Sequence, residues 1–233
     1  MSGPALSIAS AYGVPGTAGA LVSDAAGALF LLSNHHVVFG GGAKPGDRVW
    51  ALPPQDGHDR QVAFIGWGRR GQIGRVTWQS ETFFVDCALI ELADVATYPD
   101  WLQLELTRSS GFTSSWPNEI AHAQPGIGVI KTGASTGLTE GILVDVAYPD
   151  FPYIGDRAWT ATGQLLVDSA DAELNFSGPG DSGAMLLDCQ GRMLGLLWGS
   201  NTGGQGIACP IGPVLHCLAV EPAARLPWSP VCQ

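Results

Sequence analysis

Along the chain, short apolar runs alternate with turns that are rich in glycine, proline and aspartate. The first clear pair of runs covers residues 18–23 and 28–33, and the Asp-Ala-Ala-Gly segment between them predicts a β-hairpin. The N-terminal part contains no amphipathic pattern long enough for a helix. The pattern predicts strands over residues 18–23, 28–33, 47–52, 61–67, 82–92, 127–131, 138–147, 158–167, 184–188 and 193–198.

Only residues 210–220 predict a helix, because a proline stands near the start of this segment and apolar residues recur at helical spacing. Residues 94–118 are rich in Pro, Gly, Ser and Thr, which is typical of a linker. Two groups of roughly six strands flank this linker and predict an all-β fold of two antiparallel β-barrels with a groove between them. The predicted domains are an N-terminal barrel (1–97), an interdomain linker (98–118) and a C-terminal barrel with a short helix and tail (119–233).

The composition agrees with a compact all-β protein. Of the 233 residues, 45% are hydrophobic and only 14% are charged, which argues against a disordered chain. The 32 glycines and 16 prolines favour many short strands over long helices. The net charge of -10 argues against a nucleic-acid partner, because such a partner requires a basic face.

The sequence also bears on compartment and cofactors. No run reaches the roughly 18 apolar residues that cross a bilayer, and the first residues lack the features of a secretory signal. The odd cysteine count leaves at least one thiol free in a monomer, and reduced thiols favour a cytoplasmic localisation. Because no cysteine pair has metal-like spacing, we expect neither a metal nor another cofactor. The five cysteines are Cys87, Cys189, Cys209, Cys217 and Cys232.

One loop stands out as a candidate reactive site. Residues 175–184 pack three glycines, a proline and an acid around Ser182. A loop of this kind is either a surface turn or an active site, since glycines let the backbone approach a ligand closely. A serine hydroxyl becomes a strong nucleophile only with an adjacent base, a group that orients the base, and donors for the oxyanion. The loop therefore predicts a nucleophile if the rest of the chain supplies these parts.

Candidates for the other parts are present. Asp86 lies inside an apolar run, where an unpaired carboxylate is costly to bury, so it predicts an imidazole partner. The alternative is an edge-strand aspartate that faces water. The possible bases are the five histidines, of which the first two stand where a buried strand meets a turn: His35, His36, His58, His122 and His216.

Five segments then resemble, in order, motifs of the trypsin-like serine proteases. Leu-Ser-Asn-His-His-Val at 32–37 is similar to their histidine motif, above all to the Ser/Thr-Asn-Asn-His-Val form of bacterial members. Asp-Cys-Ala-Leu-Ile at 86–90 and Gly-Asp-Ser-Gly-Ala at 180–184 resemble the aspartate and serine motifs. The segment 195–200 resembles a wall of the specificity pocket, and 131–141 resembles a segment of the α-lytic-protease-like branch.

The resemblance implies a fold, an activity and a role for each motif residue. The fold would be two six-stranded chymotrypsin-like barrels, and the activity would be cleavage of peptide bonds through an acyl-enzyme. Ser182 would attack the carbonyl, His36 would transfer the proton and Asp86 would orient His36, with His35 as a neighbour. The backbone N–H groups of Gly180 and Ser182 would form the oxyanion hole.

The same resemblance places a substrate pocket and leaves one acid without its usual partner. Counting back six residues from the nucleophile leads to Phe176, where trypsin-type pockets carry an acid. An apolar or aromatic P1 side chain is therefore expected in a pocket formed by Phe176, Trp198, Gly199 and Gly206. The chain has no Ile-Val-Gly-Gly start, which would supply the partner of Asp181 in the animal enzymes. We therefore expect an arginine such as Arg157 to pair with Asp181.

Two other readings compete with the protease. An α/β-hydrolase is suggested by Gly-x-Ser-x-Ala at 180–184, but that fold needs alternating strands and helices and the order Ser, Asp, His. A non-catalytic or latent chymotrypsin-fold binding module stays open, although all three triad positions are retained. For the enzyme we expect a protein or peptide substrate and gating by a regulatory partner or a stimulus.

Overall fold

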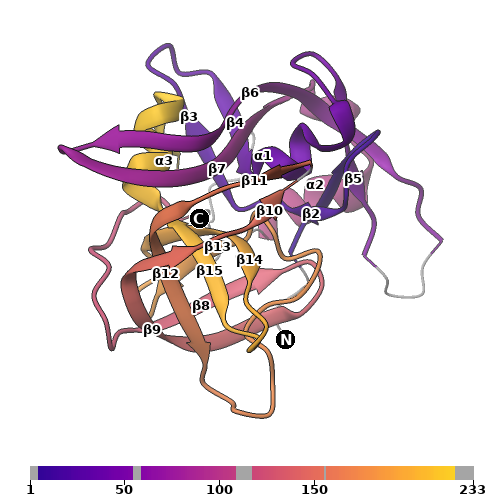
Figure 1. Ribbon diagram of the computed structural model, residues 1–233. Coiled ribbons are helices and arrows are strands. Elements are labelled where there is room, and N and C mark those ends of the chain that lie inside the picture. The colour runs from indigo at the N-terminus through magenta and orange to yellow at the C-terminus, as the bar shows by residue number, and fades with distance from the viewer. Residues whose placement is uncertain (1–4, 55–58, 109–116, 155, 224–233) are drawn as a thin grey trace.

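The computed structural model describes residues 5–54, 59–108, 117–154 and 156–223. Strands dominate these residues and form two large β-structures that follow one another along the chain (Figure 1). All ten predicted strand ranges overlap observed strands, which confirms the all-β class. Five strands lie wholly outside the predicted ranges, namely β1, β2, β10, β15 and β16, and β11 overlaps the range 158–167 only at Ala158.

The first β-structure is an antiparallel sheet of eight strands in the order β16-β3-β4-β7-β6-β5-β1-β2. Six longer strands make up its body, and a two-residue strand extends each edge. The edge strand β16 comes from the C-terminal region and pairs with β3, so the C-terminal region contributes a strand to the sheet of the N-terminal half. The strands are β1 (Ser7–Ser10), β2 (Gly16–Thr17), β3 (Ala20–Ser23), β4 (Leu29–Ser33), β5 (Arg48–Leu52), β6 (Ala63–Trp78), β7 (Glu81–Leu92) and β16 (Glu221–Pro222).

The hairpin of β6 and β7 is longer than predicted. β6 continues to Trp78, eleven residues beyond the expected end at residue 67, and pairs with β7 as far as Trp78 and Glu81, with one register shift between Gly68 and Arg70. Gln79 and Ser80 form the connection, and both have positive φ (49° and 69°), as the two-residue hairpin turn that matches the strand twist requires. Asparagine and glycine usually occupy such turns, so the Gln-Ser pair gave no sequence signal.

The second β-structure is a closed barrel of six strands in the order β12-β15-β14-β13-β8-β9. A small two-stranded sheet of β10 (Tyr153–Ile154) and β11 (Arg157–Ala158) follows β9. The barrel strands are β8 (Gly128–Gly133), β9 (Gly137–Asp150), β12 (Ala161–Ser169), β13 (Met185–Asp188), β14 (Met193–Ser200) and β15 (Gly206–Pro210).

Helix α3 (Ile211–Leu218) lies where residues 210–220 predict a helix, which confirms the short C-terminal helix. Its buried residues pack on both β-structures, and Arg70 of β6 donates from Nη2 to the carbonyl of Leu218 over 2.8 Å. The single-turn helix α1 (His35–Val38) follows β4 directly. Short 3₁₀ segments cover Gly40–Gly42 and Val95–Thr97.

Helix α2 (Asp100–Arg108) lies within the predicted linker at 98–118, so the described first part of that segment is helical rather than irregular. Leu102 and Leu106 stand one turn apart and are both fully buried against the first sheet. Pro99 accepts the first backbone hydrogen bonds of the helix. Two buried leucines within nine residues give only a weak helical periodicity. The Pro, Ser and Thr residues around them favoured the prediction of a linker.

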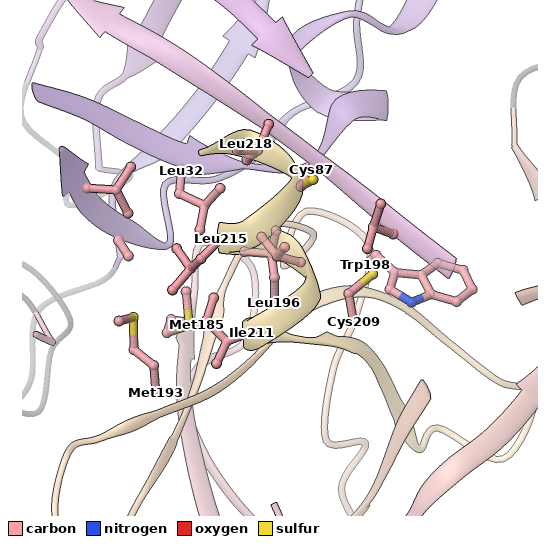
Figure 2. Close-up of a cluster of buried hydrophobic side chains, with 14 of the residues drawn as sticks. Leu32, Cys87, Met185, Met193, Leu196, Trp198, Cys209, Ile211, Leu215 and Leu218 are labelled. Carbon is pink, nitrogen blue, oxygen red and sulfur yellow. The ribbon is translucent and has the colours of Figure 1, made fainter. Parts of the chain in front are cut away.

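A hydrophobic core shared by the two halves fixes their relative position. It joins Leu32 and Phe84 of the first sheet to Met185 and Leu196 of the barrel. Figure 2 shows Leu215 of α3 between Leu32 and Met185 in this core. Each half also has its own core cluster. Residues that project from the two halves toward one another are therefore held on a rigid frame. No helix in the described ranges has the length and apolar character that crossing a bilayer demands.

Candidate active site

His36 and Asp86 form a hydrogen-bonded pair between α1 and β7. His36 Nδ1 lies 2.6 Å from Asp86 Oδ2, and the backbone N–H of His36 donates to Asp86 Oδ1 over 3.2 Å. The Asp86 side chain is fully buried, whereas 18% of the His36 side chain is exposed. Because an ionised carboxylate only accepts, the proton of a neutral His36 sits on Nδ1, and Nε2 is left as an acceptor. The water-facing alternative for Asp86 is wrong.

The corner between β4 and α1 positions this pair. The first N–H groups of a helix have no partner inside it, and Asp86 accepts the one from His36. Asn34, at the corner itself, donates from Nδ2 to the backbone carbonyl of Asp86 over 2.7 Å. Both the side chain and the main chain of Asp86 are thus tied to the segment that carries the imidazole. The sequence motif contains Asn34, but its role as a tether was not anticipated.

The two adjacent histidines differ in their affinity for protons. Burial lowers the pKa of His36, but the charge of Asp86 and its hydrogen bond outweigh burial, so the pKa is raised above 6.5. At His35 burial dominates and the pKa is lowered, although Asp86 acts in the opposite sense. His35 packs on the ring of Phe39, with centroids 5.2 Å apart. The geometry therefore singles out His36 as the imidazole that is coupled to the carboxylate.

Ser182 lies close to the helix that carries His36, since a Cβ added at Gly16 would come within 2.8 Å of both the Ser182 carbonyl oxygen and the Val37 side chain. Ser182 Oγ donates to the backbone carbonyl of Trp198 over 3.3 Å. Trp198 lines the same cleft as His36. The residue that accepts the hydrogen bond from Ser182 therefore shares a cleft with the imidazole. Within the described ranges no hydrogen bond joins Ser182 to His36. Such a bond is often long or absent before substrate binds, and rotation about the serine χ1 redirects Oγ.

The loop around Ser182 presents two backbone donors. Gly178 and Asp181 close a turn through a 3.0 Å hydrogen bond, with Gly180 at φ 103°. This left-handed conformation favours glycine, which accounts for the residue at that position. Among the residues that the structure describes, no acceptor pairs with the N–H groups of Gly180 and Ser182. Both donors are therefore available to a ligand, as an oxyanion hole requires.

Thr17 connects this loop to the first sheet. The residue is fully buried, and its hydroxyl donates to the carbonyl of Gly180 over 2.9 Å and accepts from the N–H of Ala134 over 3.0 Å. Its own N–H donates to the carbonyl of Ser182 over 2.7 Å. Ser33, three positions before His36, donates to the Thr17 carbonyl over 2.8 Å. No sequence pattern indicated a role for Thr17.

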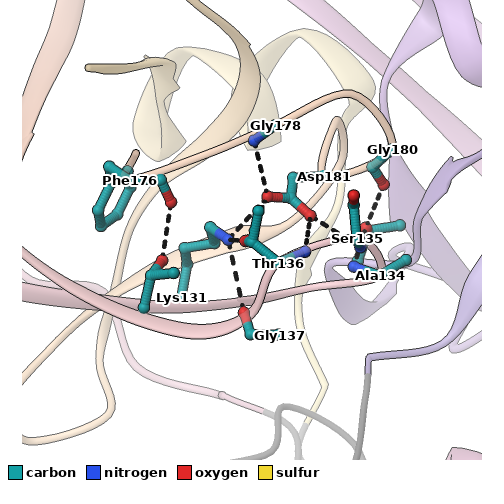
Figure 3. Close-up of polar contacts among 11 residues, drawn as sticks. Lys131, Ala134, Ser135, Thr136, Gly137, Phe176, Gly178, Gly180 and Asp181 are labelled. Carbon is teal, nitrogen blue, oxygen red and sulfur yellow. Dashed lines mark hydrogen bonds and ion pairs between the residues drawn. The ribbon is translucent and has the colours of Figure 1, made fainter. Parts of the chain in front are cut away.

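Asp181 forms a fully buried ion pair with Lys131 of β8 (Figure 3). Lys131 Nζ lies 2.8 Å from Asp181 Oδ2, which also accepts from Thr136 Oγ1 (2.6 Å) and the Gly178 N–H (3.1 Å). Asp181 Oδ1 accepts from the N–H groups of Ser135 (2.9 Å) and Thr136 (3.1 Å). Burial alone would raise the pKa of Asp181, but Lys131 and Thr136 outweigh it and lower that pKa.

The expected pairing of Asp181 with Arg157 is wrong. The Arg157 guanidinium instead lies over the ring of Trp159, 4.2 Å from its centroid. Burial lowers the pKa of Lys131, and the attraction of Asp181 offsets this effect only in part. The signal that could have identified Lys131 is its place in the apolar strand β8, because a buried lysine requires an anionic partner.

Of the four expected pocket residues, Trp198 borders the cleft that contains His36. Phe176 is fully buried in the core of the barrel, and a Cβ added at Gly206 would come within 2.5 Å of its ring. The Phe176 ring also covers Lys131, whose Nζ lies 5.8 Å from its centroid. Counting by sequence offset thus placed a core residue at the base of the pocket. Gly199 has open space beside it, and Trp198 borders the cleft.

The cleft that contains His36 has a volume of about 760 Å³. Apolar and aromatic residues make up most of its walls, and they come from the N-terminal loop, α1, β6 and the small β10–β11 sheet. The indole N–H of Trp198 donates to Gln164 Oε1 over 2.8 Å, which fixes one wall. The large wall residues are Tyr12, Phe39, Ile73, Tyr153, Trp159 and Trp198.

Sequence comparisons with known proteins find no relative. No protein-family model matches the chain, and no curated protein matches it.

Solved structures with the same arrangement are bacterial serine proteases. A glutamic-acid-specific serine protease, described as using a histidine triad in substrate binding, has a TM-score of 0.61 at 19% identity and covers 93% of this chain and 97% of its own. A Nocardiopsis protease reaches 0.59 at 16% identity, with 96% and 98% covered. An α-lytic protease homologue reaches 0.57 at 18% identity, with 94% and 97% covered. The chain therefore has the chymotrypsin-like fold of the bacterial serine proteases.

Proposed function

We propose that the protein is a serine endopeptidase that uses Ser182, His36 and Asp86. The observation that carries the proposal is the buried Asp86 carboxylate 2.6 Å from His36 Nδ1, beside a loop with a serine and two unpaired N–H donors. A buried acid is costly unless it has a partner, and an imidazole held by Nδ1 presents Nε2 as a base. The fold shared with bacterial serine proteases supports the same class of reaction.

The groups would act in a defined sequence. Ser182 Oγ attacks the carbonyl carbon of the scissile bond while His36 Nε2 takes the hydroxyl proton, and Asp86 stabilises the imidazolium that forms. The N–H groups of Gly180 and Ser182 bind the oxygen that becomes negative. His36 then gives its proton to the leaving amine, which departs and leaves an acyl-enzyme. Water activated by the same imidazole attacks the ester and releases the second product.

We also propose that a partner or a stimulus gates the enzyme. The support is that Ser182 Oγ donates to the Trp198 carbonyl, whereas attack requires it to face His36. Binding that draws the hydroxyl toward Nε2 would complete the triad. The same observation favours the second candidate function, a latent or non-catalytic module that binds protein through the cleft.

The substrate would be a protein or peptide with apolar side chains near the scissile bond, because aromatic residues line the cleft beside His36. A cytoplasmic localisation stays a prediction, in keeping with the free cysteines in the described part of the chain.

Labelling and cleavage separate these functions. The wild-type chain and Ser182→Ala are treated with a fluorophosphonate probe and with a peptide library varied at P1. We expect labelling of the wild-type chain and not of Ser182→Ala, and, once the gating partner or stimulus is supplied, cleavage with a preference for apolar P1 residues. Labelling without cleavage would indicate a gated enzyme, and the absence of both in a folded sample would favour the binding module.

A further inference from the structure

Three cysteine side chains gather behind the candidate triad. Cys87 follows Asp86 on β7 and is fully buried, Cys217 lies on α3 and is half-buried, and Cys209 lies at β15 and is fully buried. The Sγ atoms of Cys87 and Cys217 are 3.6 Å apart, which is contact distance for two thiols. Cys209 Sγ is engaged elsewhere, since it accepts from the N–H of Asp86 over 3.3 Å. Figure 2 shows Cys87 of β7 next to helix α3, and Cys209 next to Trp198.

We propose that Cys87 and Cys217 form an oxidative modification site, at which a hydroperoxide converts the two thiols into a disulfide between β7 and α3. The residues are 130 positions apart in the chain, yet their sulfurs already touch. Cys217 is half-buried, which gives the oxidant access, while Cys87 is enclosed by the core.

The chemistry assigns different roles to the two thiols. Contact with Cys87 lowers the pKa of Cys217, and burial raises the pKa of Cys87 well above its ordinary value. The Cys217 thiolate attacks the O–O bond of the peroxide and becomes a sulfenic acid, releasing water or an alcohol. Cys87 then attacks that sulfur, the S–O bond breaks, and the hydroxide leaves as water with the Cys87 proton. Two thiols lose two electrons and two protons, and the peroxide gains them.

The bridge would reach the triad through the main chain of β7. A disulfide brings the sulfurs from 3.6 Å to about 2.0 Å, so β7 or α3 must shift. Asp86 precedes Cys87, and its N–H and carbonyl are held by Cys209 and Asn34. Movement of Asp86 relative to His36 would misplace the base, and a misplacement of about 1 Å can lower activity about a hundredfold. This effect on activity rests on the proposed function, whereas the bridge itself does not.

The test maps the bridge in a folded protein that keeps only the three clustered thiols. In a Cys189→Ser, Cys232→Ser background, hydrogen peroxide is added, and the cross-linked peptides are identified by mass spectrometry without reduction. We expect one bridge between Cys87 and Cys217 that dithiothreitol reverses. Retention of all three thiols, a stable sulfinic acid on Cys217 without a bridge, or a bridge that contains Cys209 would overturn the proposal.

Two variants separate this inference from the proposed protease function. Ser182→Ala should form the bridge to the same extent, because the nucleophile takes no part in the oxidation. Cys217→Ser should form no bridge and should keep its peptidase activity in peroxide, while the parent loses activity by about tenfold or more. A bridge that forms in a wild-type chain that is neither labelled by the fluorophosphonate probe nor able to cleave peptides would contradict the proposed function and leave the modification site standing.

Discussion

Two buried aspartates organise the site in different ways. Asp86 has one side-chain partner, His36, together with one backbone N–H. Asp181 has Lys131 and four further donors, so that both of its oxygens are saturated. Both side chains are fully buried. One carboxylate is thus left to respond to the protonation of an imidazole, whereas the other is fixed as part of the frame.

The difference separates chemistry from architecture. A carboxylate whose partner titrates can stabilise the charge that appears during a reaction. A carboxylate saturated by permanent donors holds its loop in place, and here that loop carries the backbone donors of Gly180 and Ser182. We therefore expect changes at Asp86 to affect turnover above all, and changes around Asp181 to affect the folded state first.

The largest expected effect is on turnover in Asp86→Asn. The amide can donate to His36, which would favour the wrong tautomer, and the equivalent change in enzymes with this triad lowers kcat about 10⁴-fold. Peptide cleavage and the rate of fluorophosphonate labelling measure the loss. Asp188→Asn is a matched control, because Asp188 pairs with Arg192 by Oδ2 at 2.7 Å elsewhere in the barrel. Equal loss in both variants would contradict the special role of Asp86.

The next effect is on stability in Lys131→Met. This variant leaves the Asp181 charge buried without its cation, which destabilises a fold by about 3–5 kcal/mol in comparable cases. Denaturant unfolding followed by tryptophan fluorescence measures the change. The double variant Lys131→Met, Asp181→Asn removes the unpaired charge and should recover most of the loss. A single variant as stable as the wild-type chain would show that the pair contributes nothing to the frame.

The sequence motifs identified Asp86 and Asp181 but only one partner. His36 could be assigned because the resemblance fixes it within a contiguous motif. Lys131 lies fifty positions from Asp181, and only the folded barrel brings them together. The charge of Lys131 within an apolar strand was the signal that could have identified the partner of Asp181. The prediction instead named Arg157, which is exposed.

The missed elements have equally local reasons. Helix α2 shows two buried leucines within nine residues, and the β6 hairpin turns on Gln79-Ser80 without a glycine. Phe176 was taken for a pocket residue because an offset from Ser182 assumes a loop of fixed length. The order of motifs was sufficient to predict the fold, since five short segments in sequence constrain a topology even where loops vary.

A smaller effect is expected at Thr17, which lies between the two acids. Thr17→Val keeps the shape and removes the hydroxyl that contacts Gly180 and Ala134. Buried backbone groups left without partners cost about 1–3 kcal/mol, so we expect kcat to fall by about tenfold with little change in KM. Thr17→Ser restores the hydroxyl and should recover kcat. A decrease in stability with kcat unchanged would assign Thr17 to the frame alone.

The smallest expected effect is on the pH dependence of activity and stability. The pKa of His36, the partner of Asp86, and the pKa of Asp181 are shifted in opposite directions. The pKa of His36 is raised above 6.5, so the acid limb of kcat/KM, which reports the neutral base, should have its midpoint above that value. The contribution of the protonated His36 to the free energy of unfolding is fully present below pH 6.5 and is lost as pH rises through the pKa of His36 in the folded protein. Asp181 behaves oppositely, because its lowered pKa contributes stability above pH 3.8 that is lost as pH falls through the folded value. His35→Gln should leave the midpoint of the limb unchanged, since the pKa of His35 is lowered. A midpoint below 6.5 would mean that Asp86 does not hold the imidazolium, and the contrast between the two acids would fail.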